Sequence, residues 1–196
     1  TPDIVVDDSW SGTGNGAVVT YDSVNYTFGT DAFESIQEGI DAASDSQTVL
    51  VVAGTYNISS PITIQTNLSL VGENPADFSD VKIIANPTMN DTAKESIIEI
   101  TDPAVGDALT AVNISNLTVD GVDTSIDILN GIYSEVPLII DNVNIKNISN
   151  TDTGVGTPGM GMYLKDSATI SSIEMSDIGR YGIFIWEEVS KTNDSS

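Results

Sequence analysis

One pattern of apolar and polar residues occurs three times in the second half of the chain. The segments Leu117–Val122, Val143–Ile148 and Ile173–Ile178 each carry apolar residues at the first, third and sixth positions. Because side chains alternate across a strand, the first and third residues of each segment are predicted to point inward together. The segments begin 26 and then 30 residues apart, which is typical of a solenoid of stacked parallel strands.

Residues that favour turns accompany each segment. The fifth positions are Gly121, Asn147 and Asp177. These residue types tolerate a left-handed backbone, so the sixth residue is expected to point inward again from the next strand. The residues just before the segments are Asn116, Asn142 and Ser172. They are predicted to stack as a polar ladder between successive turns of the chain.

An amphipathic helix is predicted nearer the start of the chain, over residues 31–45. Asp31 is a suitable N-cap, and Glu34 three positions later completes a capping box. Phe33, Ile36 and Ile40 then recur at helical spacing. The expected organisation is a single domain with an N-terminal strand and loop (1–30), a capping helix (31–45), a parallel β-helix (46–190) and a polar tail (191–196).

The stretch from Asp31 to Gly72 resembles the start of many right-handed parallel β-helix proteins of the pectin-lyase-like superfamily. The residues that carry the resemblance are Phe33-Glu-Ser-Ile-Gln-Glu-Gly-Ile-Asp-Ala-Ala43, Thr48-Val-Leu-Val-Val-Ala-Gly-Thr-Tyr56 and Leu68-Ser-Leu-Val-Gly72. The resemblance implies an all-β fold, a right-handed parallel β-helix (solenoid) whose first turn is capped by an N-terminal α-helix. The segment Val5–Trp10, followed by such a helix, is similar to the start of archaeal and bacterial surface-layer and adhesin-like extracellular proteins.

Charge and composition narrow the function. The chain has 29 acidic and 6 basic residues, no His and no Cys, for a net charge of −23. Such a surface repels nucleic acid and anionic lipid. Without His or Cys there is no base for nucleophilic catalysis and no thiolate metal site. The basic residues form no cluster, and Lys146 is interpreted as a solvated charge. We therefore expect no catalytic residues, no enzyme activity and no nucleic-acid partner, and no apolar run is long enough to span a membrane.

Sequons for N-glycosylation are unusually frequent, since eight of the fifteen Asn residues belong to one. They are Asn25, Asn57, Asn67, Asn90, Asn113, Asn116, Asn147 and Asn193. This frequency favours an exported, glycosylated protein at the cell surface, although Asn-Ile-Ser and Asn-Leu-Thr are also typical of solenoid turns. Asn25 and Asn90, in expected loops, are the best candidate acceptors.

Acidic residues give one candidate metal site. Asp120, Asp123 and Asp127 are spaced around one expected turn, and carboxylates and carbonyls in loops are the ligands that Ca²⁺ prefers. The spacing matches no recognised calcium loop. Calcium is therefore the one candidate ion, and no organic cofactor is expected.

The last apolar strand, ending at Trp186, suggests an open end with unpaired strand edges. A continuation of the chain, another molecule or a folded-back loop would each cover it. If another copy does so, Phe184 and Trp186 are the expected anchors, meeting Thr1–Trp10 or the face near the helix. The leading hypothesis is a structural cell-surface protein that self-assembles into an extracellular layer, sheath or filament. The alternatives are a carbohydrate-binding or polysaccharide-degrading domain and the N-terminal module of a larger adhesin.

Overall fold

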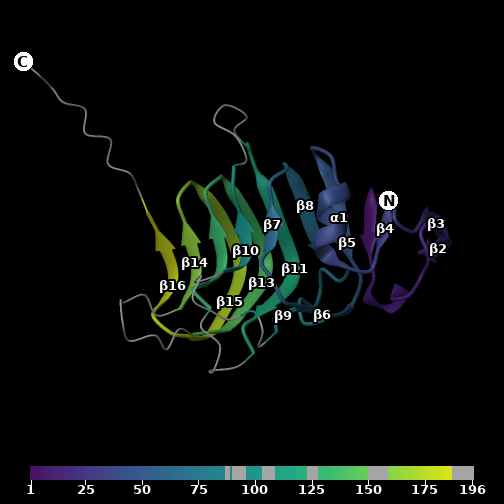
Figure 1. The fold of residues 1–196 in the computed structure, drawn as a ribbon. Helices are drawn as coiled ribbons and strands as arrows, with labels where there is room; N and C mark the ends of the chain where they lie inside the picture. The colour runs from purple at the N-terminus through teal and green to yellow at the C-terminus, as the bar shows by residue number, and fades with distance from the viewer. Residues whose placement is uncertain (87–88, 90–95, 103–108, 123–127, 150–158, 187–196) are drawn as a thin grey trace, which may run out of the picture.

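The computed structural model of the protein describes residues 1–86, 89, 96–102, 109–122, 128–149 and 159–186. Most of their strands lie in two parallel sheets that face each other (Figure 1). The larger sheet has nine strands: β1 (Ile4–Val6), β4 (Ala32–Phe33), β5 (Gln47–Val51), β6 (Gly54–Ile58), β8 (Leu68–Gly72), β9 (Val81–Ala85), β11 (Val112–Asp120), β13 (Leu138–Ile148) and β15 (Ala168–Ile178). Its main path runs in the order β15-β13-β11-β8-β5-β1-β4, and β6 and β9 pair beside it.

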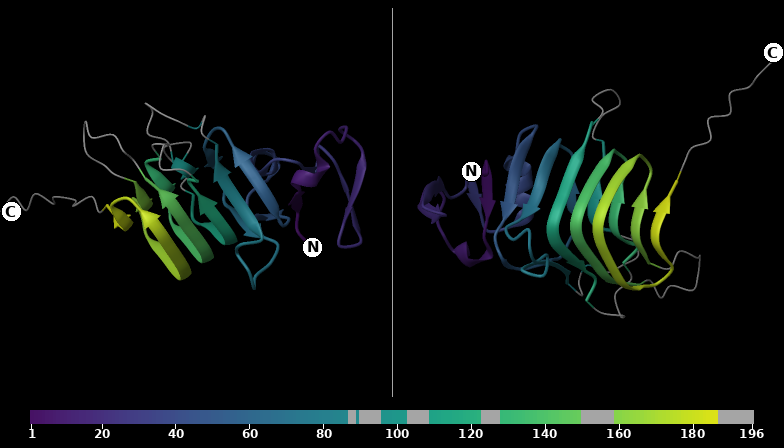
Figure 2. Two further views of the ribbon diagram at one scale, coloured as in Figure 1. Left: turned by 90° about the horizontal axis from the view of Figure 1, so that it is seen from below. Right: turned by 180° about the vertical axis from the view of Figure 1, so that it is seen from behind.

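The smaller parallel sheet has five strands: β7 (Ile62–Ile64), β10 (Ser96–Ile100), β12 (Asn130–Ser134), β14 (Met160–Leu164) and β16 (Tyr181–Ile185). From β10 onward, successive strands alternate between the two sheets. The inner faces of both sheets enclose one apolar core, in which residues such as Leu70, Ile98 and Ile132 are fully buried. Figure 2 shows the long strands of the larger sheet side by side, ending at the yellow-green β15.

A smaller unit lies at the N-terminal end of the larger sheet. The antiparallel hairpin of β2 (Val18–Tyr21) and β3 (Val24–Thr27) follows a short 3₁₀ helix, η1 (Asp8–Trp10). Tyr26 and Phe28 are buried there against Val5 and Ala32, in a second apolar cluster. This hairpin covers the end of the molecule opposite β15 and β16 (Figure 1).

The helix is shorter than predicted and is capped by other residues. Helix α1 spans Ile36–Ala42, and its N-cap is Ser35. The Ser35 hydroxyl accepts from the Glu38 amide, which caps the helix, and donates to the Glu38 carboxylate at 2.8 Å. The predicted start at Asp31 is wrong because Ala32–Phe33 instead pairs with Val5–Val6 as strand β4. Among the described residues, no helix is long and apolar enough to cross a membrane.

The predicted fold class, an all-β right-handed parallel β-helix with an N-terminal capping helix, needs correction. The strands are divided between a nine-stranded and a five-stranded parallel sheet, with a separate antiparallel hairpin. Helix α1 does not close the end of the larger sheet, because β1 and β4 extend that sheet beyond β5 and the hairpin lies beyond them. It lies instead beside β7, the end strand of the smaller sheet, where the Gln37 side chain bonds to the Thr63 amide and carbonyl. Buried Ile36 and Ile40 pack the helix onto the core. The sequence pattern predicts which side chains point inward. How the strands are grouped into sheets depends on long-range strand pairing, which the pattern does not show.

The predicted inward stacking is confirmed for most of the repeated pattern. Leu117 pairs with Val143 and Val143 with Ile173, while Ile145 lies between Val119 and Met175. Val143, Ile145 and Ile148 are all fully buried.

Val122 breaks the predicted pattern. It is 45% exposed and has a φ of 58°, so it does not point inward. The left-handed turn falls at Val122, one residue later than predicted. Gly121 lies directly against the next strand, where an added Cβ would come within 2.1 Å of the Asn147 carbonyl oxygen, so no side chain fits at this position.

The polar ladder is also present in part. Asn116, Asn142 and Ser172 all have left-handed backbones, with φ values of 59°, 54° and 49°. Asn142 Nδ2 donates to Asn116 Oδ1 at 3.0 Å, which links two neighbouring strands. Asn147 and Asp177 are left-handed as predicted, at 55° and 53°. At each of these residues the left-handed backbone bends the long strand, and the side chain of the next residue points toward the core.

Replacement of Ile145 by Asp should unfold the protein. The substitution places an unpaired carboxylate in the fully buried stack, and we expect a loss of more than about 4 kcal/mol in the free energy of unfolding. Ile139→Asp is the matched control, because Ile139 lies on the same strand and is 44% exposed. It should cost less than about 1 kcal/mol. Urea denaturation followed by circular dichroism measures both, and equal effects would show that the register is wrong.

Candidate functional site

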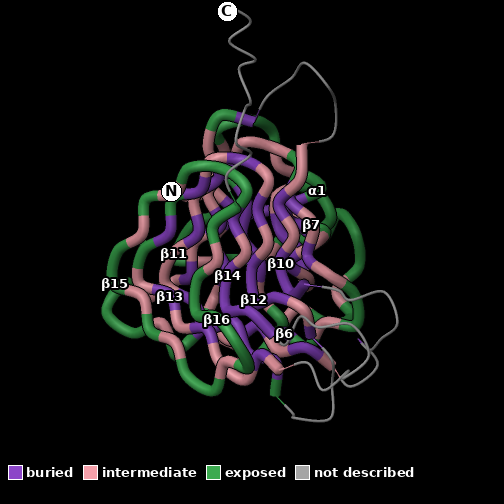
Figure 3. Tube along the Cα trace, turned by 90° about the vertical axis from the view of Figure 1, so that its left-hand side faces the viewer, coloured by how far each residue is buried: buried purple, intermediate pink, exposed green. Residues whose placement is uncertain are grey.

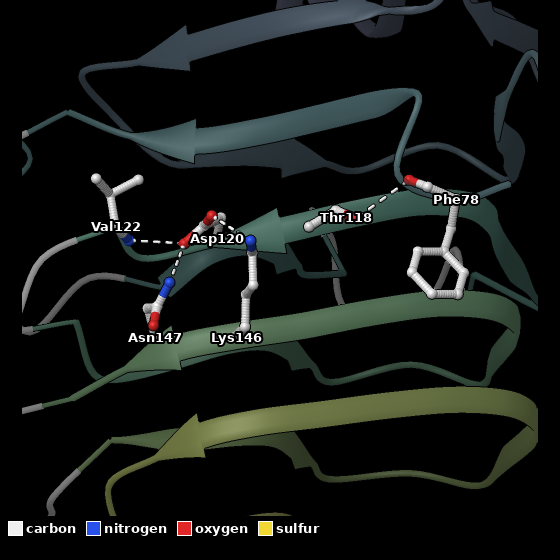
Figure 4. Close-up of polar contacts among 6 residues, drawn as sticks. All are labelled: Phe78, Thr118, Asp120, Val122, Lys146 and Asn147. Carbon is white, nitrogen blue, oxygen red and sulfur yellow. Dashed lines mark hydrogen bonds and ion pairs between the residues drawn. The ribbon is translucent and has the colours of Figure 1, made fainter.

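Asp120, the described member of the predicted calcium site, lies at the end of β11 and already has several partners (Figure 4). Its carboxylate is 3.1 Å from Lys146 Nζ. It also accepts hydrogen bonds from Asn147 Nδ2 at 2.7 Å and from the Val122 amide at 2.9 Å. Lys146 is therefore the partner of a buried carboxylate, which corrects its interpretation as a solvated charge.

This arrangement stabilises the fold and gives no support to a calcium site. Asp123 and Asp127 lie outside the described residues. Within the described ranges, no group of three His, Cys, Asp or Glu side chains is arranged to hold a metal ion. Nearby, the buried Thr118 hydroxyl donates to the Phe78 carbonyl at 3.1 Å and ties the segment before β9 to β11 (Figure 4). The polar contacts around β11 thus join neighbouring strands and loops.

Loss of the Asp120 carboxylate should destabilise the protein. Asp120→Ala leaves Lys146 and Asn147 without their acceptor, so we expect a loss of about 2 kcal/mol in the free energy of unfolding. Glu174→Ala, at an exposed position of β15, should change it by less than about 0.5 kcal/mol. Thermal unfolding at several calcium concentrations provides the measurement. An Asp120→Ala protein as stable as the parent would contradict a structural role for this carboxylate.

The sequons differ sharply in accessibility. Asn25 on β3 and Asn57 on β6 are exposed. Three others are partly buried and use their Nδ2 atoms as donors: Asn113 to Ser69 Oγ, Asn116 to the Gly72 carbonyl and Asn147 to Asp120. Since a glycan is attached at Nδ2, modification would break these links between strands.

The remaining sequons are less informative. Asn67 is half-buried, and its Oδ1 accepts from the amides of Thr110 and Ala111 at 2.7 and 3.3 Å. Asn90, one of the two best acceptors expected from sequence, lies outside the described residues, as does Asn193. Asn25, the other, lies on a strand and not in a loop, but it is exposed.

Mass spectrometry of protein from its native source should find glycans at Asn25 and Asn57. It should find Asn113, Asn116 and Asn147 unmodified, because their amide nitrogens are held between strands. A glycan on any of these three would contradict the described packing. Unmodified Asn25 and Asn57 would remove glycosylation from the functional argument.

Two strands with unpaired outer edges end the sheets opposite the hairpin. In the described chain, β15 pairs only with β13 and β16 only with β14. Figure 3 faces this end, and its outermost segments are largely exposed or intermediate. Tyr181, Ile183, Ile185 and Trp186 are 42%, 41%, 59% and 51% exposed. We call the surface formed by β15, β16 and Trp186 the terminal face.

The two residues expected as anchors differ in their surroundings. The Phe184 ring is stacked on Tyr163 with centroids 5.3 Å apart, and Tyr163 is stacked on Tyr133 at 5.5 Å. Trp186 remains half-exposed on the terminal face. The triplets Gly131-Ile-Tyr, Gly161-Met-Tyr and Gly182-Ile-Phe mark a second repeated face in the sequence, but no functional role was expected for Tyr133 or Tyr163.

An ion pair runs beside this aromatic stack. Lys165 Nζ lies 2.8 Å from Glu135 Oε1 and 5.2 Å from the centre of the Tyr133 ring. Two hydrogen bonds lower the pKa of the Glu135 carboxyl: the one from Lys165 has the larger effect and the one from Tyr133 the smaller. The hydrogen bond to Glu135 likewise raises the pKa of Lys165. The pair therefore stays ionised at neutral pH and fixes the side chains that border the stack.

Thr1–Trp10, one of the two partner surfaces suggested from the sequence, has no unpaired strand edge in the structure. Within Thr1–Trp10, strand β1 pairs with β4 on one side and with β5 on the other, and all three of its residues are buried. It therefore has no free edge for strand addition. The hairpin exposes Val18 and Val24, but it also carries the exposed sequon Asn25.

No family model matches the chain, and no curated protein matches it. Among solved structures, ORF18 of Geobacillus virus E2 superposes with a TM-score of 0.45 and 20% sequence identity. The match covers 85% of this chain and 31% of the viral chain, so this chain spans about a third of the length of the structure it matches. A likeness at this level does not bear on function.

Proposed function

We propose that this protein is a structural, extracellular component of a layer, sheath or filament at a cell surface, and that two copies join through the terminal face. The observation that carries the proposal is the pair of unpaired strand edges at β15 and β16, flanked by exposed Ile183, Ile185 and Trp186. Exposed edges of this kind recruit further strands, because their backbone N–H and C=O groups lack partners.

A second copy fits this face better than an unrelated strand. It presents the same two edges at the same separation, so β15 can pair with β15 and β16 with β16 at once. Such a contact is two-fold and antiparallel, and it is self-complementary by symmetry. The half-exposed Trp186 and Ile185 would then be buried at the joint, as aromatic and aliphatic anchors usually are.

The like-with-like contact is favoured over a head-to-tail one. A head-to-tail contact would place the terminal face on the hairpin end, where β1 is already paired on both sides. A glycan on the exposed Asn25 would also obstruct that end. A two-fold contact closes on itself, so the basic unit of the assembly is a pair with two hairpin ends pointing outward, and growth into an array needs a further contact.

Charge sets the conditions for association. Each copy carries a net charge of −23, so two copies repel each other at low ionic strength. Salt shortens the range of this repulsion to about 10 Å at 0.1 M, and a divalent cation reduces it further. The surface of such a particle suits a salty extracellular setting.

Sedimentation velocity tests the proposal. We expect a dimer that strengthens as NaCl or calcium is raised, and at least a tenfold weaker association for Trp186→Asp, which puts a further negative charge in the joint. Val18→Asp is the matched control, because Val18 is 67% exposed at the opposite end. A monomer in every buffer would contradict self-assembly. Growth that Val18→Asp blocks would instead show a head-to-tail contact.

A further inference from the structure

A pocket of about 450 Å³ lies on the five-stranded sheet, away from the outer edges of β15 and β16. It is lined by Ser96, Glu99, Leu129, Asn130, Tyr133, Met160, Tyr163 and Lys165. Strand register aligns Glu99 with Tyr133 and Tyr133 with Tyr163, so these three side chains come from equivalent positions of β10, β12 and β14. The volume falls within the range of about 300–1,000 Å³ found for small-molecule sites.

Asn130 in this pocket has a polar atom that the protein does not satisfy. The residue is 1% exposed, and its Nδ2 donates to Ser96 Oγ at 2.9 Å. Its Oδ1 is buried and accepts no hydrogen bond. Exchanging the two ends of the amide would pair Oδ1 with the Ser96 hydroxyl and leave Nδ2 unpaired instead. In either orientation, one buried polar atom of Asn130 lacks a hydrogen-bond partner within the protein, and a ligand in the pocket could supply one.

The charges around the pocket argue against an ionic ligand. Glu99 lines it and the whole chain has a net charge of −23, so an anion is repelled. A cation would meet Lys165, which also lines the pocket. The Tyr133 and Tyr163 rings are stacked on each other with an interplanar angle of 7°, and Tyr163 is stacked on Phe184 as well. The Tyr133 ring already has a cation beside it, since Lys165 Nζ lies 5.2 Å from the ring centre, so a second cation at this ring would be repelled.

A neutral sugar matches the remaining features. A hydroxyl both donates and accepts, so it can pair with Asn130 in either orientation of the amide. Glu99 provides a carboxylate acceptor, and Lys165 has donors beyond the one directed at Glu135. Leu129 and Met160 supply an apolar wall for the C–H face of a pyranose ring.

We propose that this pocket is a binding site for a neutral sugar residue, in which a sugar hydroxyl bonds to the buried Asn130 amide and a second one to Glu99. The site adjoins the terminal face, because Tyr163 is stacked on Phe184, but none of its lining residues belongs to β15 or β16. Sugar binding and association of copies can therefore be measured independently. It would hold the protein to a neutral polysaccharide or to the glycan of a neighbouring molecule.

Isothermal titration calorimetry with three oligosaccharide probes tests this site. The probes are neutral cello-oligosaccharides or manno-oligosaccharides, anionic oligogalacturonate and cationic chitosan oligomers. We expect at least one neutral probe to bind and both charged ones to bind at least tenfold more weakly. Failure of every neutral probe, or tighter binding of a charged one, would overturn the proposal.

Two variants connect the binding to the pocket. Asn130→Leu should weaken neutral-sugar binding at least tenfold and leave the fold intact, because it removes the unsatisfied group along with the amide. Glu99→Gln provides a second test if Asn130→Leu fails to fold, and it should also reduce affinity. Glu174→Ala, on β15, is the control and should bind as the parent does. Unchanged affinity in both pocket variants would overturn the assignment.

Discussion

Parallel in-register pairing is the constraint on which the rest of the structure depends. It places each residue beside an equivalent one on the next strand, so an inward Val143 must pack against an inward Leu117 and an inward Ile173. Residues of the same type at the same position of successive strands therefore stabilise the fold, and a single charge among such stacked apolar side chains destabilises it. The apolar columns at Leu117, Val119 and Ile148 therefore determine both the register and the core.

The same pairing has consequences outside the core. Polar residues at equivalent positions stack as well, and this produces the Asn116–Asn142 link and the Asp120–Lys146 ion pair. On the outer face of the smaller sheet it stacks Tyr133, Tyr163 and Phe184. In the described chain, β15 and β16 are each paired on one side only, so their outer edges can accept another strand. The proposed assembly follows from this property.

Local patterns predicted the inward positions well and the long-range arrangement poorly. The first and third positions of each repeat could be read directly, since the alternation of a strand fixes them. Two capping-box patterns, Asp31 with Glu34 and Ser35 with Glu38, could not be distinguished locally, and the pairing of β4 with β1 decided between them. The division into two sheets was equally hidden, because a strand carries the same pattern in either sheet.

The candidate sites show the same limit. Trp186, expected from the sequence as an anchor for another copy, is half-exposed, and its role in assembly stays a prediction. The pocket at Asn130 could not be predicted, since its residues come from β10, β12 and β14 and from residues directly beside these strands. The unsatisfied Oδ1 is visible only when the burial of the folded chain is known.

Hydrogen exchange at increasing protein concentration tests the central claim, assembly through the terminal face, most directly. In the free protein, the amides on the outer edges of β15 and β16 face solvent and should exchange rapidly, whereas those of β11 and β13 are protected. If copies join through the terminal face, protection should appear at β15 and β16 as the concentration rises and nowhere in the hairpin β2–β3. Exchange in β15 and β16 that is independent of concentration, while the protein associates, would contradict the account.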